Sequence, residues 1–587
     1  MHSEKKNEIV TLQVTDLGRH GEGIGRTADG YTLFVPRTVP GDEVEALILK
    51  AGKAFGYGKL RKILKSSPDR VVPICPCADT CGGCQLQFMN YEAQLAWKQQ
   101  KVRDDLTRIG GIQNPPLEPI SGMQKKLRYR NKAQFPVGMD KEGKPVAGFY
   151  AGHSHRIVPC RDCLLGAEEN APVIRVILKW MQDLHIPAYD ERTGKGLVRH
   201  VLIRKGTATG EILVCLVINS SVPEKDDRDS GNIQRRGKKN KGERLRTEWK
   251  NELIRRLKDA CASFEADSCL TGLSVNYNPE NTNVILGKKT DCIWGRPYLF
   301  DRLISEKYAF SVTYQISSQS FYQVNHEQTQ KIYEKVLDLA ALAGTETVLD
   351  LYCGIGTISL YLARRAAHVI GVEIVPQATE DARRNAELND IHNAEFFTGR
   401  AEKVVPELVR QKNIRADVVV VDPPRKGCDP ELLRTILQIS PEKLIYVSCD
   451  PATLSRDIKY LTENGYRLTY AKPYDQFGMT VHVETCVLLV HNMSTEKFTV
   501  EYTPKDSSYM EKLPPNATYR EIQEWIAQNY NGMKVSNLYI AQVKQKYGII
   551  ERENYNKGEG KAKVPKVTPE KEEAIEAALR HFRLIEN

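Results

Sequence analysis

The sequence predicts a multidomain α/β chain whose central feature is a doubly wound, Rossmann-like domain. At 587 residues the chain is too long for one hydrophobic core, so three or four domains are expected. From about residue 310 to 493, strand patterns alternate with helical patterns, which is typical of a parallel sheet covered by helices. Residues 9–65 instead contain short strand-like segments separated by glycine turns, which predicts a small N-terminal β-barrel.

The overall composition favours a globular protein with an anionic partner. Hydrophobic residues make up 41% of the chain, and the formal net charge is +10, which places RNA or DNA first among candidate partners. The chain has no long apolar run and its first residues are polar, so we expect a cytoplasmic monomer without a membrane partner. Fourteen cysteines in that compartment should not form a disulfide framework.

The N-terminal segment, residues 1–66, combines the barrel pattern with a basic surface. Phe55 and Tyr57 lie among a series of cations, namely Lys50, Lys53, Lys59, Arg61, Lys62 and Lys65. This pattern favours binding of a nucleic-acid backbone, and a solvated strand face is the alternative. The segment resembles the TRAM domain, an oligonucleotide-binding-type barrel found on RNA-modifying enzymes.

Residues 67–309 predict an α+β central domain, and residues 494–587 a small helical extension of unknown role. In the central domain, Tyr91–Ile109 has the pattern of a basic amphipathic helix, and 200–204 and 212–218 are strand-like. The run 224–250 has almost no apolar residue and is expected to be a mobile loop, with RNA contact as the alternative. In the extension, helices are expected near 518–527 and 569–584, with a charged linker at 557–569.

A hydrophobic strand at 348–351 enters a glycine turn with Gly354 and Gly356, and the next strand ends in Glu373. The glycines admit a ligand close to the backbone, and the acid is placed to accept hydrogen bonds from ribose hydroxyls. Ser359 occupies the position of the third glycine of a dinucleotide fingerprint, so no pyrophosphate cradle is indicated. The pattern resembles class I methyltransferases, which bind S-adenosylmethionine; a generic nucleotide site is the alternative.

Three strand-like segments of this domain end in residues that carry chemistry. Asp422 follows the strand 417–421, Cys449 follows the strand 445–448, and Glu484 lies in a third segment. Ligands bind at the carboxyl ends of strands in open α/β sheets, so we expect a nucleophile, a binding carboxylate and a base to meet there. The alternatives are a buried core cysteine at 449 and an edge-strand carboxylate at 484.

The residues at these strand ends suit carbon methylation of a pyrimidine. Amino-methyltransferases use a related Asp/Asn-Pro-Pro-aromatic motif, but Arg425 replaces the aromatic residue here, which argues against methylation of an exocyclic nitrogen. A thiolate that adds to carbon 6 makes carbon 5 nucleophilic, and a base must then remove the carbon-5 proton so that the thiolate can leave. Cys449 is the candidate thiolate and Glu484 the candidate base, whereas His482 is interpreted as a structural neighbour.

Four motifs together resemble the RNA uracil-C5 methyltransferase family over residues 9 to about 493. They are Asp422-Pro423-Pro424-Arg425, Ser448-Cys449-Asp450-Pro451, His482-Val483-Glu484 and Ser320-Phe321-Tyr322-Gln323-Val324-Asn325. The resemblance implies that residues 310–493 form the methyltransferase domain, with Cys449 as nucleophile and Glu484 as base. It also implies that four residues contact S-adenosylmethionine: Gln323, Tyr352, Glu373 and Asp422.

Six cysteines of the central domain have the spacing of a metal site. They are Cys75, Cys77, Cys81, Cys84, Cys160 and Cys163. Thiolates of this kind bind zinc or an iron–sulfur cluster. Cys75, Cys81, Cys84 and Cys163 match the iron–sulfur signature of some members of the resembling family, which implies a [4Fe–4S] cluster with a structural or RNA-docking role. Metal-free thiols are the alternative.

The combined prediction is S-adenosylmethionine-dependent methylation of C5 of a uridine in RNA. The resemblance points to 23S rRNA, because the leading barrel and the iron–sulfur signature are features of ribosomal members of the family. Two alternatives remain open. One is a radical-S-adenosylmethionine enzyme that modifies RNA with Cys77, Cys81 and Cys84, and the other is an inactive RNA-binding or assembly factor.

Overall fold

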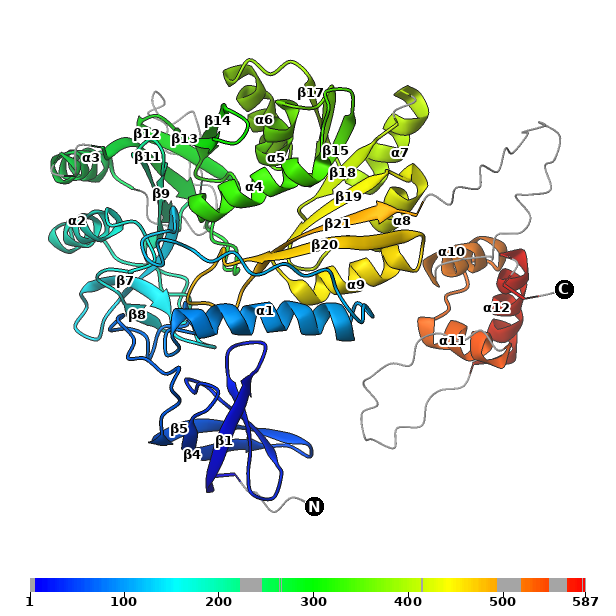
Figure 1. The fold of residues 1–587 in the computed structure, drawn as a ribbon, viewed down its shortest axis with the longest axis horizontal. Coiled ribbons are helices and arrows are strands. Elements are labelled where there is room, and N and C mark those ends of the chain that lie inside the picture. The colour runs from blue at the N-terminus through cyan, green and yellow to red at the C-terminus, as the bar shows by residue number, and fades with distance from the viewer. Residues whose placement is uncertain are drawn as a thin grey trace. The chain divides into compact units, whose positions relative to one another are not determined.

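The computed structural model describes residues 6–221, 245–262, 264, 267–412, 415–492, 519–547, 567–582 and 584–585 (Figure 1). The chain divides into two compact units, residues 1–493 and 494–587. No helix in the described part of the chain is long and apolar enough to cross a membrane.

The first unit begins with a closed five-stranded barrel of strand order β1-β2-β3-β5-β4, which confirms the predicted barrel. The strands are β1 (Ile9–Leu17), β2 (Gly23–Arg26), β3 (Thr32–Val35), β4 (Glu43–Ala51) and β5 (Phe55–Lys65). Alternate residues such as Leu33 and Val44 fill its core, as the two-residue period of a strand requires. Gly58 of β5 faces inward, where a Cβ atom would lie 2.4 Å from a methyl group of Leu33.

The central part of this unit is a seven-stranded sheet of order β12-β11-β10-β9-β6-β7-β8. Its strands are β6 (Lys132–Met139), β7 (Pro145–Tyr150), β8 (Ile157–Pro159), β9 (Val198–Lys205), β10 (Glu211–Ile218), β11 (Cys269–Tyr277) and β12 (Lys289–Gly295). Helices α2 (Asn170–Asp183) and α3 (Thr247–Cys261) pack against each other and share a hydrophobic core with the sheet. The predicted strands at 200–204 and 212–218 are therefore present within β9 and β10.

Most of the charged run predicted as a mobile loop, residues 224–250, lies outside the described residues. Its last four residues were assigned wrongly, because α3 begins at Thr247. Leu253 and Leu257, four residues apart, are buried and hold the helix on the core. The carbonyl of Trp249 accepts a hydrogen bond from Trp180 Nε1 at 3.0 Å, which anchors the first turn.

The doubly wound sheet has the order β17-β16-β15-β18-β19-β21-β20. Its strands are β15 (Thr347–Leu351), β16 (His368–Glu373), β17 (Ala394–Thr398), β18 (Val418–Val421), β19 (Lys443–Ser448), β20 (Tyr466–Tyr474) and β21 (Glu484–His491). The first five in chain order are parallel, and β21 is antiparallel to both of its neighbours. Successive residues of a strand, such as Val348 and Leu349, enter opposite hydrophobic clusters, so both faces of the sheet are covered.

Helices cover the two faces as expected for a class I methyltransferase fold. They are α4 (His326–Ala340), α5 (Thr357–Ala363), α6 (Pro376–Leu388), α7 (Ala401–Lys412), α8 (Pro430–Ile439) and α9 (Pro451–Thr462), with the hairpin β13 (Tyr298–Ser305) and β14 (Phe310–Ser317) before them. The early helix α1 (Tyr91–Arg108) packs against α9 and β20 (Figure 1). Val102 and Leu106 of α1 belong to one of the two clusters of this sheet, so a segment far away in sequence completes its core.

In its described residues, the second unit contains three helices around a hydrophobic cluster of its own. They are α10 (Tyr519–Asn529), α11 (Asn537–Lys546) and α12 (Pro569–His581). Ile522, Ile540 and Ile575, one from each helix, are fully buried in this cluster. The sequence patterns indicated helices near α10 and α12 but not α11. The predicted linker up to residue 566 lies outside the described residues.

Candidate active site

One cavity of about 690 Å³ at the carboxyl ends of the parallel strands contains all six residues expected for catalysis and cofactor binding. They are Gln323, Tyr352, Glu373, Asp422, Cys449 and Glu484. The chain leaves β15 for β16 and β17 on one side and returns to β18 and β19 on the other. The strand order therefore reverses between β15 and β18, and ligands bind at such a switch point in open α/β sheets.

The turn after β15 presents its backbone to the cavity. Gly354 and Gly356 have φ angles of +57° and +80°, and Tyr352, which is not a glycine, has a φ of +74°. A bulky residue in this left-handed region is strained, and such strain concentrates at ligand sites. Gly354 N donates to Glu373 Oε2 at 3.1 Å and Val375 N donates to Oε1 at 2.8 Å, which holds the acid at the end of β16 beside the turn.

A chain of side-chain amides positions Asp422 at the end of β18. Gln323 Nε2 donates to Asp422 Oδ2 at 3.3 Å, and Gln476 Nε2 donates to Gln323 Oε1 at 3.2 Å. Gln476 also donates to Thr329 Oγ1 of α4 at 3.2 Å. Gln476 did not emerge from the sequence, because its only signal was a polar residue in the loop before β21. The structure makes it the support of the Gln323–Asp422 contact.

Three buried carboxyl groups lie in or beside the cavity: Asp422 and Glu484 line it, and Asp350 lines a small adjoining cavity that Asp422 also lines. Burial, and then the nearby Asp350, raise the pKa of Asp422 to about 7. Burial likewise raises the pKa of Asp350 to about 7, although the Ser359 hydroxyl donates to it. Burial and Asp422 raise the pKa of Glu484 well above its usual range, and its Oε1 has no hydrogen-bond partner. This arrangement suits a positively charged ligand and a carboxylate of high basicity.

Cys449 lies between the end of β19 and the start of α9, whose N-cap is Asp450. Burial, with smaller contributions from Glu484 and Asp422, raises the pKa of the Cys449 thiol to about 12, although the Arg425 guanidinium lowers it. His482 Nε2 lies 3.2 Å from Arg425 Nη2, and burial together with Arg425 lowers the pKa of His482 to about 4. His482 is therefore neutral at pH 7 and pairs with the arginine that faces the thiol.

The barrel contacts the segment around Cys449 directly. Arg19, in the turn between β1 and β2, reaches Asp450 with Nη2 and Oδ2 2.8 Å apart. Leu17 and Val39 of the barrel pack with Val481, which immediately precedes His482. Nothing in the local sequence around Arg19 indicated this contact.

A fully buried ion pair joins α1 to the loop before β21. Lys98 Nζ and Asp475 Oδ1 are 2.5 Å apart, and both side chains are completely inaccessible to solvent. Tyr91 OH donates to Asp475 Oδ2 at 2.8 Å, and Lys98 Nζ donates to the Phe477 carbonyl at 3.2 Å. Because Phe477 lines the catalytic cavity, this pair positions part of its wall.

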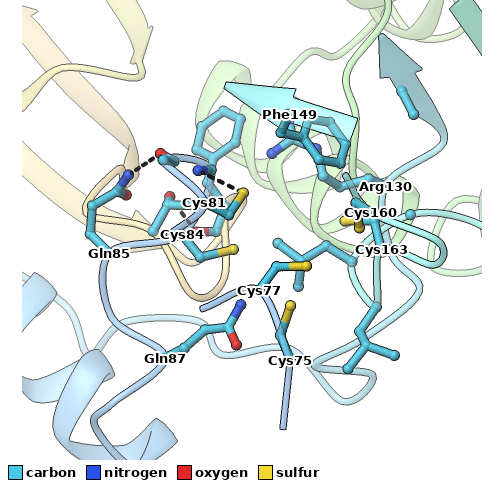
Figure 2. Close-up of a pocket in the computed structure, with 18 of the residues that line it drawn as sticks. Cys75, Cys77, Cys81, Cys84, Gln85, Gln87, Arg130, Phe149, Cys160 and Cys163 are labelled. Atoms are coloured by element: carbon cyan, nitrogen blue, oxygen red, sulfur yellow. Dashed lines mark hydrogen bonds between the residues drawn. The ribbon is translucent and has the colours of Figure 1, made fainter. Parts of the chain in front are cut away.

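The six clustered cysteines line a second cavity of about 470 Å³ (Figure 2). Burial raises the pKa of Cys84 to about 12, and the neighbouring Cys163 and Cys81 contribute in the same direction. Burial lowers the pKa of Lys132 on the wall of the cavity to about 7, and no described carboxylate pairs with it. Within the described residues, the structure contains no group of three or more His, Cys, Asp or Glu side chains placed to hold a metal ion.

The sheet order, the glycine turn and the acid at the end of the second strand define a class I methyltransferase fold. The family model for tRNA (uracil-5-)-methyltransferases matches residues 281–492, and the TRAM domain model matches residues 4–60. An uncharacterized RNA methyltransferase of Halalkalibacterium halodurans is 45% identical over 484 residues, which cover 82% of this chain and 97% of the relative. One from Clostridium tetani is 41% identical over 488 residues, with 83% and 97% covered.

A solved structure has the same architecture. The tRNA (uracil-54, C5)-methyltransferase of Pyrococcus abyssi, in complex with S-adenosyl-L-homocysteine, superimposes with a TM-score of 0.60 at 26% identity, covering 81% of this chain and 99% of that chain. The chain belongs to the RNA (uracil-5-)-methyltransferase family, and the methyl donor of such an enzyme is S-adenosylmethionine. These findings bear out the predicted family, and none of them supports the radical alternative based on Cys77, Cys81 and Cys84.

Proposed function

We propose that this enzyme methylates C5 of a specific uridine in 23S rRNA, with Cys449 as nucleophile and Glu484 as base. The observation that carries the proposal is the convergence of Cys449, Glu484 and Asp422 in one cavity, beside the glycine turn after β15. A thiol and a carboxyl group at neighbouring strand ends are what addition to carbon 6 and proton removal from carbon 5 require.

Four residues would bind S-adenosylmethionine in this cavity: Gln323, Tyr352, Glu373 and Asp422. Glu373 retains lone pairs for the ribose hydroxyls after it accepts from two backbone amides. The cofactor supplies an electrophilic methyl group on a positively charged sulfur. The residues present fit it, because Glu484 Oε1 is buried in the cavity without a partner and the carboxyl groups that line the cavity favour a cation.

Different side chains then carry out different steps of the reaction. The Cys449 thiol loses its proton to solvent, and the resulting thiolate forms a bond to carbon 6 of the uracil. The electron pair released onto carbon 5 would bond to the methyl group as the methyl–sulfur bond of the donor breaks and S-adenosylhomocysteine leaves. Glu484 accepts the proton from carbon 5, and the carbon–sulfur bond breaks to restore the ring. The raised pKa of Glu484 makes its carboxylate a strong acceptor for that proton. Arg425 stabilises the thiolate against the surrounding carboxyl groups.

We also propose that Cys75, Cys81, Cys84 and Cys163 hold a [4Fe–4S] cluster. Two features of the cavity support this proposal: it is lined by thiols from two separate segments, and Lys132 on its wall has no carboxylate partner among the described residues. Four thiolates and a cluster carry net negative charge and would compensate this lysine. Cys160 is buried, unlike the four proposed ligands, and its thiol pairs with Cys77. A cluster with four protein ligands supplies a structural link in this cavity.

The mechanism is tested by incubating the protein with 5-fluorouridine-substituted 23S rRNA and S-adenosylmethionine. Fluorine cannot leave as a cation, so the base step stops and a covalent protein–RNA complex should persist on a denaturing gel. Cys449→Ala should abolish the complex, whereas Cys269→Ala, at an exposed cysteine on β11, should preserve it. An active wild-type enzyme that forms no complex would exclude the covalent mechanism.

The RNA target is tested separately by mass spectrometry of 5-methyluridine in matched transcripts of 23S rRNA and tRNA. Methylation of the ribosomal transcript alone is expected. Methylation of the tRNA transcript alone would overturn the ribosomal assignment and leave the chemistry intact.

A further inference from the structure

The loop between β20 and β21, residues 475–483, borders two cavities of the protein. Phe477 of this loop lines both the catalytic cavity and the cavity of the six clustered cysteines, here called the cysteine cavity. Tyr474, the last residue of β20, pairs with Glu484, the first residue of β21, so the proposed base lies at the foot of the loop. A shift of the loop would therefore move a wall of the catalytic cavity together with the base.

Met479, in the middle of this loop, has a left-handed backbone conformation with a φ of +64°. A side chain in this region costs about 1–2 kcal/mol, so neighbouring contacts must hold the residue there. The Met479 carbonyl accepts hydrogen bonds from Gln85 N and Leu86 N, both at 3.1 Å. These two donors directly follow Cys84, and Cys84 and Gln85 line the cysteine cavity (Figure 2).

The side chain of Met479 is held by the same part of the molecule. It packs against the small hydrophobic cluster that two thiols of the cysteine cavity also contact, those of Cys84 and Cys163. Tyr129, a buried member of that cluster, donates from its hydroxyl to the carbonyl of Gly478 at 3.0 Å. The strained backbone at Met479 is therefore imposed by tertiary contacts from the wall of the cysteine cavity.

The rest of the loop links Met479 to Glu484 through short contacts. Thr480 Oγ1 donates to the Phe477 carbonyl at 2.7 Å and accepts from His482 N at 3.3 Å. The rings of Phe477 and His482 meet edge to face, with centroids 6.1 Å apart. Because these contacts cross the loop from one side to the other, a displacement of Met479 is transmitted to the start of β21 instead of being absorbed.

We propose that Met479 is a positioning residue for methyl transfer, through which the segment Cys84–Leu86 sets the position of Glu484. The proposal rests on the proposed function for the role of Glu484 as base. A base acts only within hydrogen-bond distance of the proton it removes, and a displacement of about 1 Å can slow a reaction about 100-fold. Cys449 does not lie on the loop. A misplaced Glu484 should therefore delay proton removal and the release of the thiolate, but not the attack on carbon 6.

The test follows the covalent protein–RNA intermediate in single-turnover reactions of the full chain, resolved on a denaturing gel. The substrate is an RNA transcript that the wild type methylates, which is 23S rRNA under the proposed function. Met479→Val places a β-branched side chain in the left-handed region and should displace the loop. Breakdown of the intermediate is expected to slow at least about tenfold. The adduct with the 5-fluorouridine-substituted transcript should still form at nearly the wild-type rate.

Two further variants control for damage to the fold. Met479→Leu keeps an unbranched Cβ atom and a similar volume, so it should release the product at nearly the wild-type rate. Leu95→Val changes a residue of α1 that packs against the same hydrophobic cluster but lies outside the loop. It should lower the stability of the protein without accumulation of the intermediate. Equal slowing of adduct formation and intermediate breakdown in Met479→Val would indicate general damage and overturn the proposal, as would breakdown at the wild-type rate.

Tyr129→Phe decides the question if Met479→Val fails to fold. This variant removes one oxygen atom and, with it, the hydrogen bond to the Gly478 carbonyl. It should slow breakdown of the intermediate and leave formation of the 5-fluorouridine adduct unchanged; breakdown at the wild-type rate would then overturn the proposal. An active wild type that forms no 5-fluorouridine adduct would instead remove the proposed covalent mechanism. A wild type that forms the adduct, with breakdown insensitive to the loop variants, would remove this proposal alone.

Discussion

Replacing Lys98 by methionine is expected to destabilise the first unit by about 3–5 kcal/mol, although lysine is ordinarily a surface residue. The structure sets this magnitude, because Lys98 and Asp475 are both 0% exposed and their charged atoms are 2.5 Å apart. In the variant, Asp475 keeps the hydrogen bond from Tyr91 but becomes a buried charge without a counterion. The exposed pair of Arg108 and Asp104 on the same helix provides the matched control, and Arg108→Met should cost less than about 1 kcal/mol.

The assay is equilibrium unfolding of the full chain in urea, followed by tryptophan fluorescence. The double variant Lys98→Met/Asp475→Asn should lose less free energy of unfolding than the two single variants together, because it removes both charges and leaves neither one buried alone. Two results would contradict this prediction. One is that Lys98→Met lowers the free energy of unfolding no more than Arg108→Met does. The other is that the double variant loses at least as much free energy of unfolding as the two single variants together.

Three further outcomes are expected. Affinity for S-adenosylmethionine should increase as pH rises through about 7, because Asp422 ionises there. Calorimetry between pH 6 and 8 would measure this change. Asp422→Asn should bind the cofactor weakly, and its affinity should depend less on pH. Arg19→Gln should lower kcat about two- to fivefold with little change in RNA affinity, because Arg19 supports Asp450 through a largely exposed ion pair. After anaerobic reconstitution, Cys81→Ala should lose bound iron, whereas Cys77→Ala should retain it.

Each of these three predictions would be contradicted by a specific result. Affinity for the methyl donor that falls with rising pH would contradict the ionisation assigned to Asp422. A loss of RNA affinity with unchanged kcat in Arg19→Gln would make that arginine an RNA contact instead of a support for Asp450. Equal loss of iron in Cys77→Ala and Cys81→Ala would contradict a ligand set that includes Cys81 but not Cys77.

The sequence predicts those structural features of this protein that depend on residues close together in the chain. The glycine turn, the strand that ends just before Cys449 and the alternation of the barrel strands each depend on a few consecutive side chains and backbone angles. Because parallel strands share one carboxyl edge, the local patterns also predicted that Asp422 and Cys449 would meet, and both line one cavity. Glu484 lies at the same edge because it begins β21, which is antiparallel to β19. Helix α11 was missed, because its amphipathic pattern is weaker than that of α10 or α12.

Tertiary structure alone decided which distant groups support that cavity. Lys98 and Asp475 are 377 residues apart in the chain, and Arg19 and Asp450 are 431 residues apart. The sequence of α1 indicates a basic amphipathic helix, and a lysine on such a helix is ordinarily solvated. Lys98 is buried because the loop before β21 brings a carboxylate to it, and no local pattern encodes the position of that carboxylate. Side-chain periodicity thus determines strands, turns and their ends, whereas the partner of a buried charge exists only once the chain has folded.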